Sequence, residues 1–321
     1  MAPNVSRTLR VLYLYAGPHR RAELGTALRE VAKLDEDPAD IEIEELDILR
    51  GRKSDLSVQS RQNEIIAKIL TNYYDLVVSS PPCETFCRAL YTNKLGPRPI
   101  RSSAHPRGFP WLTGAAKIKC DLANAHVDFS LRALRAAAEV GTRALLEHPE
   151  DLGRSKLGTQ GTIWQWPELR TLEEDFLNFF TGAFSQCAWH IGLPYKKPTR
   201  LLTDLALLEV DLYTGWPSMD AEGWYLGPVP KDCGHNNHSP LIQRADQPSG
   251  VFQTSGTGSY PWGMCMTLAR AILHDEVIMA RVAKRTLKPI PTGGTTTLRL
   301  QNDLLFSEHA LLWNKMRREH R

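Results

Sequence analysis

Short apolar runs alternate, in the first half of the chain, with longer segments that are apolar at every third or fourth position. The apolar runs predict strands at 9–15, 41–48, 74–80 and 142–149. The segments between and after them predict helices at 22–34, 57–70, 121–140 and 168–180. This alternation favours an α/β fold with a Rossmann-like, mostly parallel sheet that carries helices on both faces.

The second half of the chain is less periodic. Gly, Pro, Trp and His are frequent from about 186 to 262, which is typical of loops, and a helical pattern returns at 263–285. We therefore expect a catalytic domain at 1–204, a small loop-rich lobe at 205–250, a closing helix within 251–288, and a flexible linker and tail at 289–321.

Composition narrows the class of protein. The 321 residues contain 39 Lys plus Arg against 36 Asp plus Glu, and a formal net charge of +3 excludes a histone-like protein. No window has the ~18 apolar residues of a spanning helix, and the apolar run near the start is too short for a signal peptide. The six cysteines are scattered, as is typical of reduced thiols. We expect an intracellular monomer without membrane contact, nuclear in a eukaryote.

Three predicted strand ends carry residues suited to chemistry, and in such sheets these ends form the ligand-binding edge. The three are Ala16-Gly17-Pro18, Ser80-Pro81-Pro82-Cys83 and Glu147-His148-Pro149. Two prolines with fixed φ hold Cys83 just beyond its strand, which suits a nucleophilic thiol. An inert thiol that packs in the core is the alternative.

In this order, Tyr15-Ala16-Gly17, Pro82-Cys83 and Glu147-His148-Pro149 resemble the motifs of the cytosine-C5 methyltransferase family. The form Pro-Pro-Cys-x-x-Phe-x-Arg is close to the eukaryotic branch that includes tRNA-directed members. The resemblance implies that Cys83 adds to C6 of a flipped cytosine and that Glu147 binds the N3 and amino edge of the base. It also implies support from an arginine, for which Arg200 is the candidate.

The resemblance implies S-adenosyl-L-methionine as the cofactor. Tyr15 to Gly17 would form the turn under its methionine end, Glu44 or Glu45 would bond the ribose, and Asp47 would lie near the adenine. Ser80 and Pro81 complete the assigned residues. The acids have an alternative role as a solvated strand edge.

The chain departs from the family at three places. Pro18 stands where a second glycine is usual, and His148 replaces an asparagine. The late Gln-x-Gly-Asn-Ser motif is absent, and Tyr260-Pro261 with the following helix is its candidate replacement. These departures favour a mobile-element or phage-like branch.

A basic segment begins near Cys83. Between Arg88 and Lys119 lie seven cations and no acid, interleaved with aromatic residues. A solvated face is one explanation, but cations beside aromatic rings also suit phosphate contact and base stacking. The residues assigned to nucleic acid are Arg88, Lys94, Arg98, Arg101 and Arg107.

Cys233, His235 and His238, with Cys187 as a fourth ligand, have the residue types of a structural zinc site. Their spacing is irregular, however, and a polar loop with hydrated histidines explains it as well. The sequence therefore predicts no metal.

We expect an S-adenosyl-L-methionine-dependent cytosine-C5 methyltransferase that acts on a flipped cytosine in double-stranded DNA, with residues 205–250 recognising the target. The first alternative is the same chemistry on tRNA. A nucleic-acid-binding module with a degenerate site is the second, because of Pro18 and the missing late motif. A thiol hydrolase that pairs Cys83 with His148 is a weaker rival.

Overall fold

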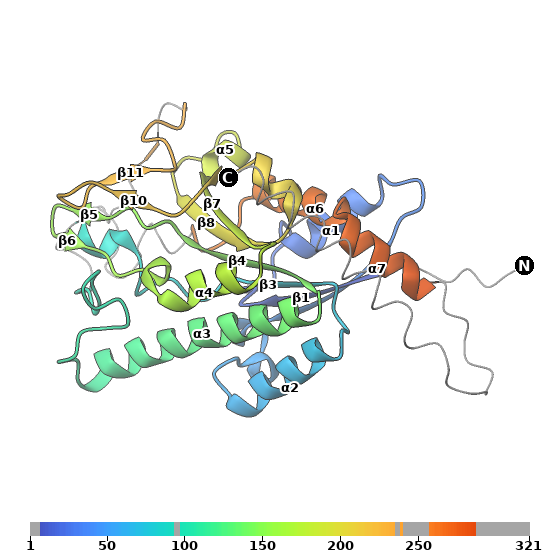
Figure 1. Ribbon diagram of the computed structural model, residues 1–321, viewed down its shortest axis with the longest axis horizontal. Helices are drawn as coiled ribbons and strands as arrows, with labels where there is room; N and C mark the ends of the chain where they lie inside the picture. The colour runs from blue at the N-terminus through green and yellow to red at the C-terminus, as the bar shows by residue number, and fades with distance from the viewer. Residues whose placement is uncertain (1–6, 93–96, 235–237, 240–256, 287–321) are drawn as a thin grey trace, which may run out of the picture.

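The computed structural model describes residues 7–92, 97–234, 238–239 and 257–286. A seven-stranded sheet with the order β2-β1-β3-β4-β8-β7-β9 forms its centre (Figure 1). The first four strands, all parallel, are β1 (Thr8–Leu14), β2 (Asp40–Leu46), β3 (Leu76–Ser79) and β4 (Arg143–Pro149). The four apolar runs of the first half therefore form the strands predicted for them.

The rest of the sheet is antiparallel. It consists of β7 (Phe180–Ser185), β8 (Pro198–Thr203) and β9 (Tyr213–Thr214), where β8 pairs with both β4 and β7. The sheet is therefore mixed, and the prediction of an α/β fold is confirmed at that level. The helix predicted over 168–180 ends early, as α4 (Pro167–Asp175), because Phe180 begins β7.

Helices cover both faces of the sheet (Figure 1). On one face, α2 (Gln59–Leu70), α3 (Gly114–Glu139) and α4 pack over the aliphatic side chains of β1, β3 and β4. On the other face, α1 (Leu24–Ala32), α6 (Trp262–Leu273) and α7 (Glu276–Thr286) bury a second core. Within the described residues, no helix has the length and apolar character needed to cross a membrane.

The closing segment is two helices where we predicted one. Asp275 separates α6 from α7, and its Oδ1 accepts the backbone N–H of Ile278 at 2.9 Å, which is the bond of an N-cap. Tyr260, just before α6, stacks on Tyr13 of β1 with ring centroids 6.1 Å apart. The chain thus returns to its first strand, as the sequence predicted.

The described part of the predicted lobe divides in two. Residues 206–214 contribute a short helix and β9 to the main fold, whereas the hairpin of β10 (Ser218–Met219) and β11 (Tyr225–Gly227) stands apart from the sheet; residues 235–237 and 240–250 lie outside the described residues. A second hairpin pairs β5 (Arg154–Ser155) with β6 (Gly158–Thr159). The remaining short helices are 48–50, 52–54, 88–91, 163–165, 206–210 and α5 (Gln186–Trp189). The predicted tail at 289–321 lies outside the described residues.

Candidate active site

The strand order reverses between β1 and β3. From β1 the chain passes through α1 to β2 on one side, and then through α2 to β3 on the other. In a doubly wound sheet, the carboxyl ends of the strands at such a switch point border the ligand crevice. The turn after β1 and the segment from Ser80 to Cys83 after β3 both lie at this switch point.

The turn after β1 has an unusual backbone. Tyr15 has a φ of 62° and Gly17 one of 70°, both in the left-handed region. The N–H of Tyr15 donates to the Leu46 carbonyl at 2.8 Å, and the N–H of Gly17 donates to Asp47 Oδ2 at 2.9 Å. Asp47, which we assigned to the adenine, therefore fixes the turn through one carboxylate oxygen.

Arg50 also lies at this turn, although no pattern in the sequence indicates it. Its Nε donates to the Gly17 carbonyl at 2.7 Å, and its Nη atoms contact Glu45 at 2.5 Å and Glu23 at 2.9 Å. Glu45 Oε1 is buried and has no hydrogen-bond partner among the described residues. Burial raises the pKa of Glu45, and Arg50 opposes this effect. Glu45 is the acid of β2 that keeps an oxygen for a ligand.

Glu44 points to the opposite face of β2. Its carboxylate accepts bonds from Lys68 at 2.6 Å and from the hydroxyl of Tyr74. Burial would raise the pKa of Glu44, but these two bonds outweigh it and the pKa is lowered. Of the two acids proposed for the ribose, Glu44 is therefore committed to structure.

Cys83 is half-buried at the end of the Pro81-Pro82 segment, and its carbonyl accepts the N–H of Phe86 at 2.9 Å. Burial raises the pKa of the Cys83 thiol to about 11. The charge of Lys197 lowers this pKa, whereas the charge of Glu147 raises it. The three groups therefore form one electrostatic unit.

Glu147 is buried in β4 and its Oε1 has no partner among the described residues. Burial raises its pKa, while Lys197 and the hydroxyl of Tyr260 lower it. Tyr260 also contacts Ser80 Oγ, which lies 3.5 Å from the Tyr13 hydroxyl. These hydroxyls join β1, β3 and the start of α6 around the carboxyl group, which leaves one oxygen for an incoming hydrogen-bonding group.

His148 is not placed to assist Cys83. It points to the face opposite Glu147, where its ring packs against Phe86 and Trp164. Burial lowers its pKa to about 3, and neither ring nitrogen has a partner among the described residues. An imidazole with so low a pKa is a weak proton acceptor, and its ring lies on the face opposite Glu147, so the geometry does not favour His148 as the base of a thiol hydrolase.

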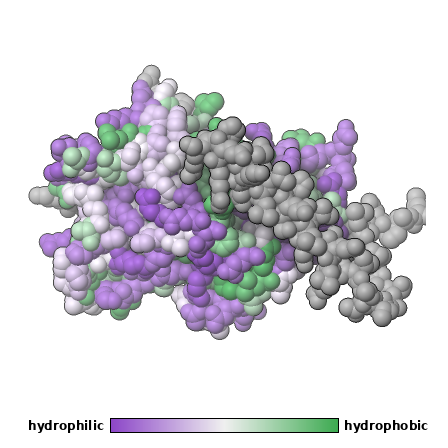
Figure 2. All heavy atoms as spheres, viewed as in Figure 1, coloured by the Kyte–Doolittle hydropathy of each residue, from purple (hydrophilic) through white to green (hydrophobic). Residues whose placement is uncertain are grey.

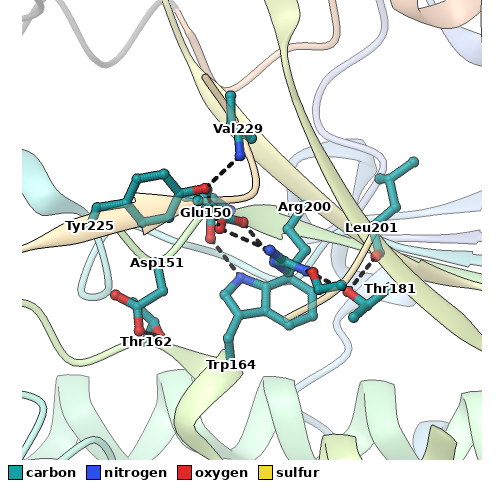
Figure 3. Close-up of polar contacts among 12 residues, drawn as sticks. Glu150, Asp151, Thr162, Trp164, Thr181, Arg200, Leu201, Tyr225 and Val229 are labelled. Carbon is teal, nitrogen blue, oxygen red and sulfur yellow. Dashed lines mark hydrogen bonds and ion pairs between the residues drawn. The ribbon is translucent and has the colours of Figure 1, made fainter. Parts of the chain in front are cut away.

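Arg200 does not reach the site, contrary to the prediction. It pairs with His148 across β4 and β8, so both side chains lie on the face opposite Glu147. Arg200 is fully buried, and its Nε and Nη2 contact the two oxygens of Glu150 at 2.6 and 2.9 Å. Figure 3 shows the pair beneath Tyr225, whose hydroxyl donates to Glu150 at 3.0 Å. Arg200 thus holds β8 and the β10–β11 hairpin together.

Lys197, and not Arg200, lies on the face of Glu147. Because β8 runs antiparallel to β4, its amino end lies at the carboxyl edge of β4. Lys197, just before β8, follows the alternation that places Leu201 on the face of Glu147. Its Nζ donates to the Thr257 carbonyl at 2.8 Å, which fixes the charge near Cys83 and Glu147.

The basic segment is neutralised in space. Arg107 contacts Asp128 at 3.0 Å and Glu168 at 2.6 Å, and Lys117 and Lys119 contact Asp121 and Glu84. Arg101, which we assigned to nucleic acid, is fully buried and stacks on Phe86 at 3.7 Å. Arg98 is exposed, and Lys94 lies outside the described residues. Of the described residues that we assigned to nucleic acid, Arg88 and Arg98 are therefore the two that are neither buried nor paired with an acid.

A different basic surface lies between the β4–β8 edge and the β10–β11 hairpin. The described residues that line this groove of about 440 Å³ include no acid. Its cations and aromatic residues are Arg88, Arg154, Lys196, Lys231, Trp224 and Tyr225. Arg88 donates to the carbonyls of Leu152 and Arg154, so it also shapes the wall. Much of the described surface in Figure 2 is hydrophilic, so polarity alone does not distinguish the groove from the rest of that surface. The absence of acids among its described lining residues does.

Three of the four potential zinc ligands lie together. Cys187 begins α5, and its Sγ, Cys233 Sγ and a ring nitrogen of His238 all lie within 4.8 Å of one another. Cys233 Sγ lies 3.1 Å from His238 Nε2. His235 lies outside the described residues.

No protein-family model, no curated protein and no solved structure matches this chain.

Proposed function

We propose that this protein methylates C5 of cytosine in DNA, with Cys83 as nucleophile and S-adenosyl-L-methionine as methyl donor. The observation that carries the proposal is that Cys83 follows β3, Glu147 lies near the end of β4 and Lys197 precedes β8, all at one edge of the sheet, where the charges of Glu147 and Lys197 act on the thiol. A thiol beside a carboxyl of raised pKa suits addition to a ring that must be protonated as it is attacked.

The residues at the switch point fit the cofactor. Glu45 Oε1 is a buried acceptor without a described partner, as a ribose hydroxyl would need. A side-chain carbon at Gly17 would meet only Arg20, at 3.8 Å, so the turn is open to a ligand. Tyr15, Ala16, Ser80 and Pro81 line the two strand ends beside it. When bound, S-adenosyl-L-methionine supplies an electrophilic methyl group and leaves as a thioether.

The protonation of the Cys83 thiol and that of the Glu147 carboxyl depend on each other. Burial disfavours a second anion beside Glu147, so the Cys83 thiolate is favoured when Glu147 is neutral. Protonated Glu147 donates to N3 of the cytosine while the thiolate sulfur bonds to C6. The electron pair of the C5–C6 double bond becomes available at C5, which would form a bond to the methyl group that the cofactor supplies. Loss of the C5 proton to water, cleavage of the C6–sulfur bond and return of the N3 proton to Glu147 then restore the ring, the thiolate and the protonated carboxyl.

The groove supports a nucleic acid as the substrate. Four cations, with no acid among the described lining residues, suit a phosphate backbone, and exposed Trp224 offers a ring for stacking. The groove recognises backbone charge, which DNA and tRNA share. The test of the function therefore includes both polymers.

The test is covalent trapping on 5-fluorocytosine. In this base a fluorine replaces the hydrogen at C5, so no proton can be lost there and the enzyme stays bonded to C6. We expect the parent protein, given cofactor and a 5-fluorocytosine duplex, to form an adduct that peptide mass spectrometry locates at Cys83. Cys83→Ser abolishes it, and Cys87→Ser, which removes the nearest other half-buried thiol, retains it.

Three results would contradict the proposal. Methyl transfer by Cys83→Ser at the parent's rate excludes the nucleophile. Trapping on tRNA alone assigns the same chemistry to RNA. No adduct on either polymer, with no cofactor binding by calorimetry, identifies a nucleic-acid-binding module.

A further inference from the structure

Residues far apart in the chain form a compact thiol–imidazole cluster away from the candidate active site. Cys187 is buried at the start of α5, whereas Cys233 and His238 are half-buried in the segment after β11. None of the six cysteines forms a disulfide. The cluster is therefore formed by the tertiary fold and not by one loop.

The dimensions of this cluster suit a small tetrahedral cation. With Zn–S near 2.3 Å and Zn–N near 2.0 Å, two ligand atoms of one zinc ion lie about 3.5–3.8 Å apart. The three atoms here lie within 4.8 Å of one another, and one pair is 3.1 Å apart. Side-chain rotation alone could therefore bring them to zinc distances. Two thiolates and an imidazole bind Zn²⁺ in preference to Mg²⁺ or Ca²⁺, which take oxygen ligands.

We propose that Cys187, Cys233 and His238 bind a Zn²⁺ ion, with the fourth position completed by a water or another ligand. This inference is independent of methyl transfer, because no group of the candidate active site takes part in it. It also revises our expectation from the sequence, in which irregular spacing argued against a metal. Spacing is a weak guide here because one ligand comes from α5, 46 positions before Cys233.

The ion would fasten one wall of the basic groove. Val229, Pro230 and Lys231 line that wall, directly before Cys233. Val229 anchors the start of this wall, because it is buried against Tyr225 and its N–H donates to the Tyr225 hydroxyl at 2.9 Å. Beyond Val229 the described ties are hydrogen bonds: Lys196 Nζ donates to the carbonyls of Pro230 at 3.1 Å and Lys231 at 2.6 Å, and Ser239 N–H to that of Pro194 at 2.7 Å. A bound zinc ion stabilises a segment far more than such exposed bonds. Zinc would therefore set the width of the groove.

The first measurement is the metal content of the full-length protein after dialysis against a weak chelator. We expect about one zinc per chain, and cobalt exchanged into the site to give thiolate-to-cobalt charge transfer and tetrahedral visible bands. Cys187→Ser, Cys233→Ser and His238→Ala each lower the zinc content at least about tenfold. Cys265→Ser and His274→Ala, which change residues outside the cluster, keep it.

A second measurement needs no variant. In the parent protein, zinc protects Cys233 from alkylation, and a strong chelator raises its alkylation rate at least about tenfold, while the rate at Cys83 stays constant. The proposal is overturned if the dialysed parent holds no zinc, if the ligand variants hold as much as the parent, or if Cys187 and Cys233 form a disulfide in reductant-treated protein.

Discussion

Replacement of Arg200 by methionine tests whether this residue supports catalysis, as the resemblance implies, or stabilises the fold through its ion pair with Glu150. In the structure, Arg200 neutralises Glu150 through two contacts and donates to Thr181 Oγ1 at 3.0 Å and to the Gly215 carbonyl at 2.6 Å. Both partners of the ion pair are fully buried. Arg200→Met leaves the Glu150 carboxylate with the Tyr225 hydroxyl as its remaining described donor.

An uncompensated buried charge of this kind costs about 3–5 kcal/mol. For a protein of this size, each kcal/mol lowers Tm by about 2–3 °C, so we expect Arg200→Met to melt ~6–15 °C below the parent. Glu150→Gln added to Arg200→Met removes the stranded charge and keeps an acceptor for Tyr225. The double variant should therefore recover at least about 1–2 kcal/mol.

The effect also depends on pH in a known direction. Burial raises the pKa of Glu150, and Arg200 opposes that rise. Without Arg200 the folded-state pKa lies further above the unfolded value, so the folded state binds a proton that the unfolded chain releases. Stability of the variant therefore falls as pH rises through that pKa, and the deficit is smaller at pH 5 than at pH 8.

The assays are urea unfolding at the two pH values and trapping on 5-fluorocytosine DNA by the folded fraction. Glu147→Gln is the control, because it should abolish trapping and leave Tm within about 2 °C of the parent. A variant Arg200→Met that unfolds like the parent but no longer traps the base would refute the reasoning and return Arg200 to the catalytic site.

Three further predictions follow from burial and backbone geometry. With the Cys83 pKa at about 11, its alkylation rate should rise about tenfold per pH unit from 7 to 10, and Lys197→Met should slow it; peptide mass spectrometry that finds a flat profile contradicts this. Gly153→Ala would place a side-chain carbon 2.5 Å from the Gly223 carbonyl at a φ of +61°, so it should speed proteolysis of the β10–β11 hairpin, unlike Gly114→Ala, whose site is open. Arg101→Ala should lower Tm by several degrees, whereas Arg98→Ala should leave Tm unchanged and reduce the salt slope of DNA binding by about 1; equal Tm values would show that Arg101 is not structural.

Most of the parallel half of the sheet could be predicted because β1, β3 and β4 are largely buried on both faces, whereas the edge strand β2 shows an alternating pattern. The residues of β3 are all buried, and such a strand appears in the sequence as an uninterrupted apolar run. The antiparallel strands β7 and β8 carry Thr, Gly, Ser and Arg, whose polar groups bond to neighbours supplied by the fold. Nothing in their periodicity distinguishes them from loops.

The position of Lys197 shows why the candidate site was predicted only in part. Cys83 and Glu147 could be identified because each ends a recognisable strand. The choice between Lys197 and Arg200 depended on the direction and register of β8. Arg200 is paired with His148, and a shift of one residue would exchange the two faces. The resemblance predicted a basic residue in this segment. The register of β8 against β4 decides that Lys197, and not Arg200, lies on the face of Glu147.

The distribution of charge also depends on the fold. The acidic stretch from Glu30 to Asp47 and the basic segment from Arg88 to Lys119 are separate in the sequence, but in the structure many of their described charges pair with charges of opposite sign. Arg50, Arg61 and Lys68 contact the acids of β2, and Asp121, Asp128 and Glu168 contact the cations. Paired charges release few counterions on binding DNA. The salt dependence of binding should therefore come from the acid-free groove beside Lys197, where cations from four separate segments converge.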